Sequence, residues 1–290
     1  MTTKAVSVRD ISELRARTSA GMMDCKAALE EAGGDMNRAA EILRAKGITK
    51  AEKRGGRVAA QGLVVIGAAA AASDLAMIEL DCETDFVART DGFAELARAL
   101  ATHAAKQAPA GVHPGEAIES QPFDGRTVGE AIKELAGKTG EATTLRRVAH
   151  FAQPAGTVQS YLHHNGQVGV LVELEGPAGE VLATLGRELA LHIASTDPLA
   201  VSQADIAPEV LERERRIAEE QVAAEGKPEA IRPKIVEGKV RKFVAERTLL
   251  GQPFVKDESK TAGELVNEAA KTLGAAVTVK RFARFKVGEA

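Results

Sequence analysis

Short apolar stripes separated by glycine breaks run through the first 47 residues and predict three short helices. Each stripe has the three- and four-residue spacing that places its members on one helical face. Ser7 and Asp10 have the spacing of a capping box before the first helix, and Asp35 can cap the third. The stripes are Val8, Ile11 and Leu14; Met22, Cys25, Leu29 and Ala32; and Met36, Ala39, Ala40 and Leu43. Met23 lies off the second stripe, so it is either exposed or enclosed by a core that takes both methionines.

Beyond a glycine-containing basic stretch, the pattern changes to short apolar runs that predict paired strands. Residues 62–67 and 75–80 form the first pair, and a helix with Phe93, Leu96 and Leu100 on one side follows. A similar order returns later in the chain, which predicts a diverged repeat. The later elements are a strand at 157–162, a turn at 163–166, a strand at 168–174 and a helix at about 180–195.

Aligning the two copies shows that the first has five more residues between its strand and its helix. The strand segment 76–80 matches 170–174 at an offset of 94, whereas the helix stripe that starts at Phe93 matches the one at Leu182 at an offset of 89. An ordinary connection needs only a few residues. The surplus includes Phe86 and Val87, two apolar side chains among acidic residues at a position where hydration favours polar ones.

Helical periodicity resumes at Pro208 and continues for about 40 residues, which predicts a protruding antiparallel helical hairpin that turns at 225–228. Its charged outer positions, such as 212–216, are expected to be solvated. A helix at 261–273 and an alternating strand at 277–287 follow, and this last strand is expected to join the sheet of the second copy.

These patterns predict an α+β protein with antiparallel sheets. We expect an N-terminal three-helix module at 1–54, a first core subdomain at 55–145 and a second at 146–290, with the helical hairpin inserted in the second at about 207–250.

Composition limits the classes of function. The chain has 290 residues, of which 44% are apolar and 27% charged, and its net charge is −3. This is the composition of a globular protein and argues against nucleic acid as the main partner. No apolar run reaches the length of a membrane span and no signal peptide is evident, so the cytoplasm is the expected location. Cys25 and Cys82 are far apart and are expected to be small buried thiols.

Catalytic and metal-binding patterns find no support in the sequence. Phosphate-binding glycine loops, nucleophile elbows and zinc-binding helices are all missing. His163 and His164 fall in the predicted turn, where adjacent side chains do not converge on one metal. Asp81, Glu83 and Asp85 lack the glycine and distal glutamate of a calcium loop. We therefore expect neither an enzyme nor a bound cofactor.

Two long motifs, residues 15–29 (Arg-Ala-Arg-Thr-Ser-Ala-Gly-Met-Met-Asp-Cys-Lys-Ala-Ala-Leu) and 82–89 (Cys-Glu-Thr-Asp-Phe-Val-Ala-Arg), resemble signature segments of the bacterial elongation factor Ts family. Residues 160–163, the hairpin at 206–250 and the segment 250–255 are similar to the family in order and spacing. The resemblance covers roughly residues 5–288. Longer family members continue into a C-terminal helical module after the final strand, so contacts that such a module makes are not expected of residues 1–290.

The resemblance implies an N-terminal module like a ubiquitin-associated domain, two similar α+β subdomains and an inserted hairpin. It implies elongation factor Tu, GDP-bound or nucleotide-free, as the partner, and promotion of GDP release as the activity. It assigns Mg²⁺ dislocation in the partner to Thr84, Asp85, Phe86 and Val87. It gives further contacts to Arg15, Met22, Met23 and His163. Whether the assembly is a heterotetramer with the partner or the free chain a homodimer stays open.

Two other classes of function make different expectations. An RNA- or ribosome-associated scaffold would use the basic stretch 46–57 and would bind RNA with a steep salt dependence. An enzyme would need convergent titratable groups in a pocket. A purely structural interpretation of Phe86 is that its side chain packs under its own domain, where it would contribute to stability alone.

Overall fold

The computed structural model describes residues 6–18, 22–40, 42–43, 60–69, 74–152, 156–226 and 228–289, without the side chains of Arg9 and residues 15–18. The N-terminal part contains α1 (Val8–Thr18), α2 (Met22–Glu31) and helical residues at 36–40 and 42–43. The Ser7–Asp10 capping box forms, and the Asp35 carboxylate accepts the backbone N–H groups of Asn37 and Arg38. The three predicted helical segments are therefore present.

The alternative of a core that encloses both methionines is excluded for this module. Met22 belongs to the apolar stripe of the second helix, yet 56% of it is exposed, and Met23 is 74% exposed. The module closes its core with smaller residues instead, among them Leu14, Cys25 and Leu29, which are fully buried. Both methionines are left at the start of α2 as an apolar surface.

The first sheet has the order β1-β2-β6-β3 and is antiparallel throughout. The two long helices α5 and α7 pack against this sheet, and shorter elements connect them. The elements are β1 (Gln61–Ala68), β2 (Asp74–Cys82), α4 (Asp85–Ala88), α5 (Asp91–Gln107), β3 (Gly111–Pro114), α6 (Glu116–Glu119), β4 (Pro122–Phe123), β5 (Arg126–Thr127), α7 (Val128–Thr139) and β6 (Thr143–Ala152).

The second sheet has the order β11-β8-β7 and is likewise antiparallel. The predicted final strand does join it, beside β8. The elements are β7 (Gly156–Leu162), β8 (Val168–Glu175), α8 (Glu180–Thr196), η1 (Gln203–Asp205), α9 (Pro208–Ala224), η2 (Glu229–Ile231), α10 (Arg232–Arg247), η3 (Leu249–Gly251), β9 (Pro253–Phe254), β10 (Asp257–Thr261), α11 (Ala262–Leu273) and β11 (Thr278–Lys286).

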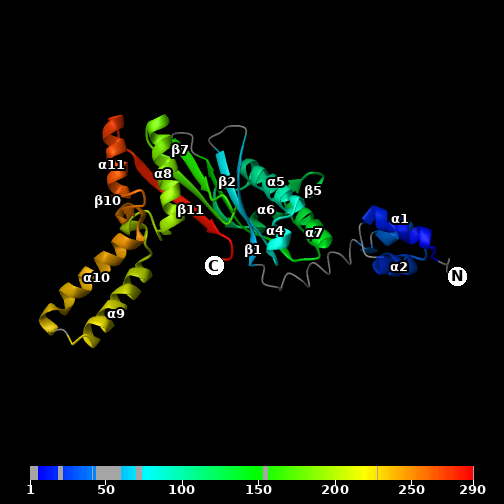
Figure 1. Cartoon of the computed structure of the whole chain (residues 1–290), viewed down its shortest axis with the longest axis horizontal. Helices are drawn as coiled ribbons and strands as arrows, with labels where there is room; N and C mark the ends of the chain where they lie inside the picture. The colour runs from blue at the N-terminus through cyan, green and yellow to red at the C-terminus, as the bar shows by residue number, and fades with distance from the viewer. Residues whose placement is uncertain are drawn as a thin grey trace.

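Alternation along each strand creates a four-layer arrangement of helices, sheet, sheet and helices. On β2, Ile78 points to the core shared with α5 and α7, whereas Met77 points to the other sheet. On β8, Val172 points to the core shared with α8 and α11, whereas Leu171 points to the first sheet. Figure 1 shows α5 and α7 on one side of the sheets and α8 and α11 on the other.

Strand β6 changes the expected division between the subdomains. The prediction ended the first subdomain at residue 145, within this strand, but β6 pairs with β2 along its whole length and so belongs to the first sheet through Ala152. Sequence periodicity assigned no element to β6 or α7. The two sheets also share a core, in which Phe151 and Phe285 are buried. Each subdomain therefore buries part of its apolar surface against the other.

The duplication extends further than the strand and helix that the sequence aligned. Helix α7 matches α11 at an offset of 134: both begin at a threonine capping box and end at a left-handed glycine, Gly140 in one and Gly274 in the other. Strand β6 matches β11 at the same offset. The elements β3 and α6 of the first copy stand where the second copy carries the hairpin.

A reciprocal pair of buried ion contacts joins the two copies. Arg147 donates to the fully buried Glu79 of its own sheet and stacks over Phe285 of the other sheet, 4.4 Å from the ring centre. Arg281 donates to the fully buried Glu173 and stacks over Phe151 at 4.2 Å. Each arginine thus neutralises a carboxylate in one sheet and covers an aromatic ring of the other.

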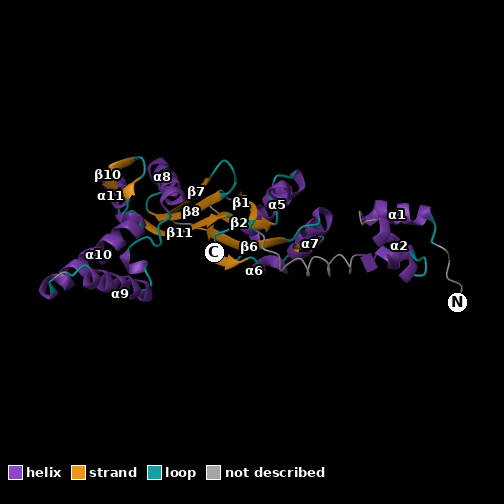
Figure 2. Ribbon diagram, turned by 60° about the horizontal axis from the view of Figure 1, so that its bottom comes forward, coloured by secondary structure: helices purple, strands orange, loops and turns teal. Residues whose placement is uncertain are grey.

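The predicted hairpin is formed by α9 and α10, which pack on Ala218, Val222 and Val236. Figures 1 and 2 show the pair extending away from the sheets at the α11 end of the molecule. Pro208 and Pro233 stand in the first turns of the two helices, where a missing N–H costs nothing.

Candidate functional site: a helical turn that exposes Phe86

The surplus residues between β2 and α5 form a single helical turn, α4, rather than an open loop. Thr84 is its N-cap, and the Thr84 hydroxyl accepts the Val87 N–H. Phe86 is 81% exposed, the highest value among the exposed large apolar side chains of the described residues. This excludes the interpretation that Phe86 tucks under its own domain.

Val87 differs from its neighbour. The sequence-based prediction gave it the same exposed role as Phe86, but its side chain is only 9% exposed and packs in the core of the first subdomain with Ala88 and Phe93. One turn of helix explains the difference, because consecutive side chains point about 100° apart. Val87 therefore anchors the turn, and the apolar contact surface is Phe86.

Two carboxylates fasten the base of the turn to the α7–β6 connection. Glu141 accepts the Thr84 N–H at 3.0 Å and the Thr84 hydroxyl at 2.7 Å. In the opposite direction, Glu83 accepts the Ala142 N–H at 2.8 Å. Asp85, at the first position of the turn, pairs with Arg89 at 3.0 Å, and both of these side chains are exposed.

Behind the turn, two buried groups have raised pKa values. Burial, followed by the nearby Glu79, raises the pKa of Asp81 to about 7, against the opposing effect of Arg146. Burial, with a contribution from Glu141, raises the pKa of the Cys82 thiol to about 12, so this cysteine is a neutral thiol that donates to the Thr84 carbonyl. The expectation of a buried thiol is confirmed for Cys82, and Cys25 is buried as well.

A groove beside the turn joins it to the predicted turn at 163–166. Its wall includes Phe86, Glu83 and Leu63 from the first subdomain, and Asn165 and Gln167 from the second. Gln167 donates to the Gly62 carbonyl and the Val64 N–H donates to the Gly166 carbonyl, which holds the second turn against β1, the strand that α4 contacts. The two copies of the repeat thus contribute to one surface.

His163 directly follows β7, in the same turn as Asn165, which lines this groove. It is half-buried, its Nδ1 is 3.0 Å from the Tyr161 hydroxyl, and its ring is 4.3 Å from that of the exposed His164. Leu162, the last residue of β7, is a 42% exposed apolar residue that the sequence pattern did not single out.

The N-terminal candidates are only partly described. Met22 and Met23 are exposed on α2, while Arg15 lies in α1 with its side chain outside the described part of the chain. The basic stretch 46–57, on which the RNA-binding alternative depends, lies entirely outside the described residues.

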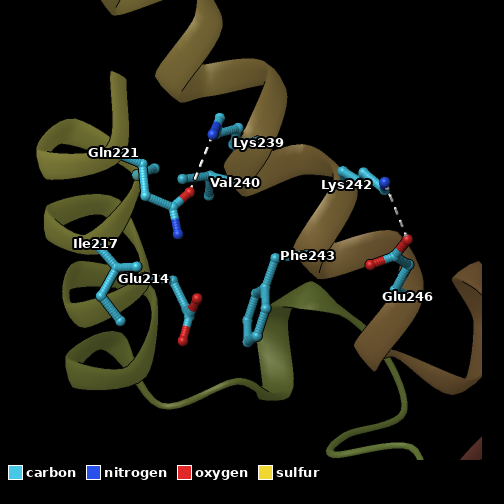
Figure 3. Close-up of a pocket in the computed structure, with 9 residues that line it drawn as sticks. Glu214, Ile217, Gln221, Lys239, Val240, Lys242, Phe243 and Glu246 are labelled. Carbon is cyan, nitrogen blue, oxygen red and sulfur yellow. Dashed lines mark hydrogen bonds and ion pairs between the residues drawn. The ribbon is translucent and has the colours of Figure 1, made fainter. Parts of the chain in front are cut away.

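A second groove lies on the hairpin (Figure 3). Ile217 and Gln221 of α9 face Val240 and Phe243 of α10 across it, and Lys239 donates to Gln221 at 3.0 Å. The prediction of a solvated outer face holds for Glu212, Arg213, Arg215 and Arg216, whereas Glu214 is half-buried and lines the groove.

Within the described ranges, no three His, Cys, Asp or Glu side chains come together in a group that could hold a metal ion. Among the helices that the structure describes, none combines the length and apolar content that crossing a bilayer would require.

The fold and the site thus define a class: an α+β scaffold whose main surface feature is an exposed aromatic ring on a fastened turn, as in proteins that bind other proteins. The family model for elongation factor Ts matches residues 83–289. The chain is 44% identical to elongation factor Ts of Aquifex aeolicus across 98% of each protein. It is also similar to elongation factor Ts of Sinorhizobium fredii, with 43% identity over all of this chain and 94% of that protein, and of Clostridium perfringens, with 41% identity over 98% and 93%.

The chain therefore belongs to the elongation factor Ts family and to the machinery of translation elongation.

Proposed function

We propose that this chain binds elongation factor Tu and promotes the release of GDP, so that GTP can take its place. The observation that carries the proposal is the 81% exposure of Phe86 on a turn that is capped and hydrogen-bonded at its base. An exposed phenyl ring held on an ordered element is suited to enter an apolar crevice of a partner, since little conformational entropy is lost when it docks.

An exchange factor acts by binding the nucleotide-free partner more tightly than the loaded partner, because only differential affinity shifts an equilibrium. GDP is held by Mg²⁺, by a phosphate-cradling backbone and by base contacts. We propose that Phe86 separates helices of the nucleotide domain and that this movement draws the ligands of Mg²⁺ away from the ion. Burial of the ring supplies roughly 1.5–3 kcal/mol toward that distortion, and each ~1.4 kcal/mol changes a rate tenfold.

The other residues of the turn take different parts in this proposal. Asp85, at the exposed start of α4, hydrogen-bonds to the partner, while Thr84 and Val87 hold the turn in place. Met22 and Met23 make a separate apolar contact from the N-terminal module, together with Arg15. His163, in the turn whose Asn165 lines the same groove as Phe86, contacts another domain of the partner. The protein needs no cofactor of its own and acts without catalytic residues.

The test of the proposal is complex formation and GDP release with purified elongation factor Tu. We expect a stable complex on size-exclusion chromatography without nucleotide, and its dissociation when GDP is added, because linkage requires nucleotide and factor to weaken each other equally. The mass of the complex distinguishes a 1:1 assembly from a heterotetramer, and the mass of the free chain shows whether it is a homodimer. Failure to accelerate GDP release would overturn the proposal, and salt-sensitive RNA binding without the GTPase would favour the scaffold alternative.

A further inference from the structure

Glu141 is the candidate for a residue that acts on exchange without touching the partner. It follows Gly140, the left-handed C-cap of α7 with φ +79°, so the sharp turn at the end of that helix directs the next side chain toward α4. Both Glu141 oxygens are then used on one residue: one accepts the Thr84 N–H and the other the Thr84 hydroxyl.

These two bonds act on the residue that starts the turn. Thr84 caps α4 because its hydroxyl oxygen accepts the Val87 N–H. Glu141 accepts the proton of the same hydroxyl, which orients the hydroxyl so that a lone pair of its oxygen faces Val87. A helical turn as short as α4 has little stability of its own, because the first turn of a helix is its costly nucleus. The presentation of Phe86 therefore depends on contacts from outside the turn.

The second copy of the repeat supports this assignment independently. Helix α11 ends at Gly274, the counterpart of Gly140, and the next residue is Ala275 where the first copy has Glu141. The second copy also lacks the surplus turn: β8 ends at Glu175 and α8 begins at Glu180. The residue after the helix thus has a carboxylate in the first copy, where it holds α4, and a methyl group in the second copy, which has no counterpart of α4.

We propose that Glu141 is a positioning residue for exchange, which keeps α4 formed so that Phe86 is presented to the partner. This rests on the proposed function, because it gives Glu141 a role only through Phe86. If loss of the carboxylate leaves the turn formed about a tenth of the time, the apparent affinity for the partner falls about tenfold.

The experiment compares GDP release from elongation factor Tu with four forms of the full chain: native, Phe86→Ala, Glu141→Ala and the double variant. The matched control is Glu264→Ala, which removes a carboxylate that likewise accepts the N–H and hydroxyl of a capping threonine, Thr261, but at α11 in the second copy. We expect Glu141→Ala to reduce the stimulated rate at subsaturating factor about tenfold, the control to leave it unchanged, and the double variant to match Phe86→Ala.

Hydrogen exchange supplies a readout on the turn itself. The N–H groups of Ala88 and Arg89 donate to the carbonyls of Thr84 and Asp85, so they should exchange faster in Glu141→Ala and at native rates in Glu264→Ala. Should Glu141→Ala fold poorly, Glu141→Gln keeps one acceptor oxygen and should give an intermediate loss.

The outcomes separate the two proposals. If Phe86→Ala retains native exchange, the function proposed for the turn fails. If Phe86→Ala loses exchange while Glu141→Ala keeps it, or if the two losses multiply in the double variant, the assignment of Glu141 is overturned and the proposed function stands.

Discussion

The two copies of the repeat share a scaffold and, besides the inserted hairpin, differ at the connection that follows their central strand. In the second copy, β8 reaches α8 through a short segment that contains Gly176 and Gly179. In the first copy, β2 reaches α5 through α4, which exposes Phe86. The sheets, the capped helices and the buried arginine–glutamate pairs are common to both. The comparison teaches that the scaffold is built by the shared parts and that the candidate site arises where one copy has residues that the other lacks.

The largest expected effect concerns the shared parts. Among the described residues, Arg147→Ala leaves the fully buried Glu79 with the Gly288 N–H as its one remaining hydrogen-bond partner, so it should lower the free energy of unfolding by about 3–5 kcal/mol. Arg281→Ala should cost less, because Lys280 stays 3.0 Å from Glu173. Urea unfolding of the two variants measures the two losses of stability. Equal losses would show that Lys280 does not compensate Glu173 for the missing arginine.

The next prediction compares Asp81 with its counterpart Glu175, which is exposed and paired with Lys280. The pKa of Asp81 is raised from 3.8 to about 7, so the folded state holds a proton that the unfolded state has lost. The free energy of unfolding should therefore fall as pH rises from about 4 to about 7, by a few kcal/mol at most.

Asp81→Asn should remove most of that fall, and Glu175→Gln should leave it in place. Thermal unfolding of the native chain and both variants between pH 4 and pH 8 is the measurement. A native pH profile in Asp81→Asn would assign the titration to another group.

A smaller effect separates the two apolar residues of the turn. Val87→Ala should reduce stability by about 1–2 kcal/mol because it opens space in a buried cluster, whereas Phe86→Ala should change it by less than about 0.5 kcal/mol. The measurement is the free energy of unfolding of both variants by chemical denaturation. If Phe86→Ala were the more destabilising of the two, the exposed ring would have to pack against its own chain in solution.

The smallest effect is expected at Arg89. Its pair with Asp85 is exposed on both sides, and such pairs contribute about 0.2–1 kcal/mol. Arg89→Ala should therefore lower the free energy of unfolding by less than about 1 kcal/mol in urea unfolding. A loss as large as that of Val87→Ala would mean that the ion pair, rather than the capping and burial described above, maintains the turn.

Sequence pattern was sufficient for much of the scaffold. Apolar periodicity predicted the hairpin of α9 and α10, helix α5 and the return of β11 to the second sheet, because each buries one face or alternates between two layers. It failed for Met22, since a helical stripe does not show which of its ends the neighbouring helices cover. It also assigned no element to α7, although Thr127, Glu130 and Gly140 carry cap signals that were available.

The site was less accessible to sequence. The surplus of residues located the turn, but periodicity could not divide Phe86 from Val87, because a single turn is too short to show a face. The contact of Thr84 with Glu141 spans 57 residues and follows from the pairing of β6 with β2, which sets Thr143 opposite Cys82 and which no local pattern encodes. An alignment of the two copies at the offset of 134 would have drawn attention to Glu141, which is alanine in the other copy.

The most direct test of the central claim is the maximal rate of GDP release from elongation factor Tu at saturating factor, measured for the native chain, Phe86→Ala and the control Val112→Ala. Val112 is an apolar residue of β3 that is 52% exposed away from the turn. If Phe86 acts in the distortion itself, its removal should lower the maximal rate at least about tenfold rather than only raise the concentration needed for half-saturation. Val112→Ala should match the native chain. A native maximal rate in Phe86→Ala would contradict the account.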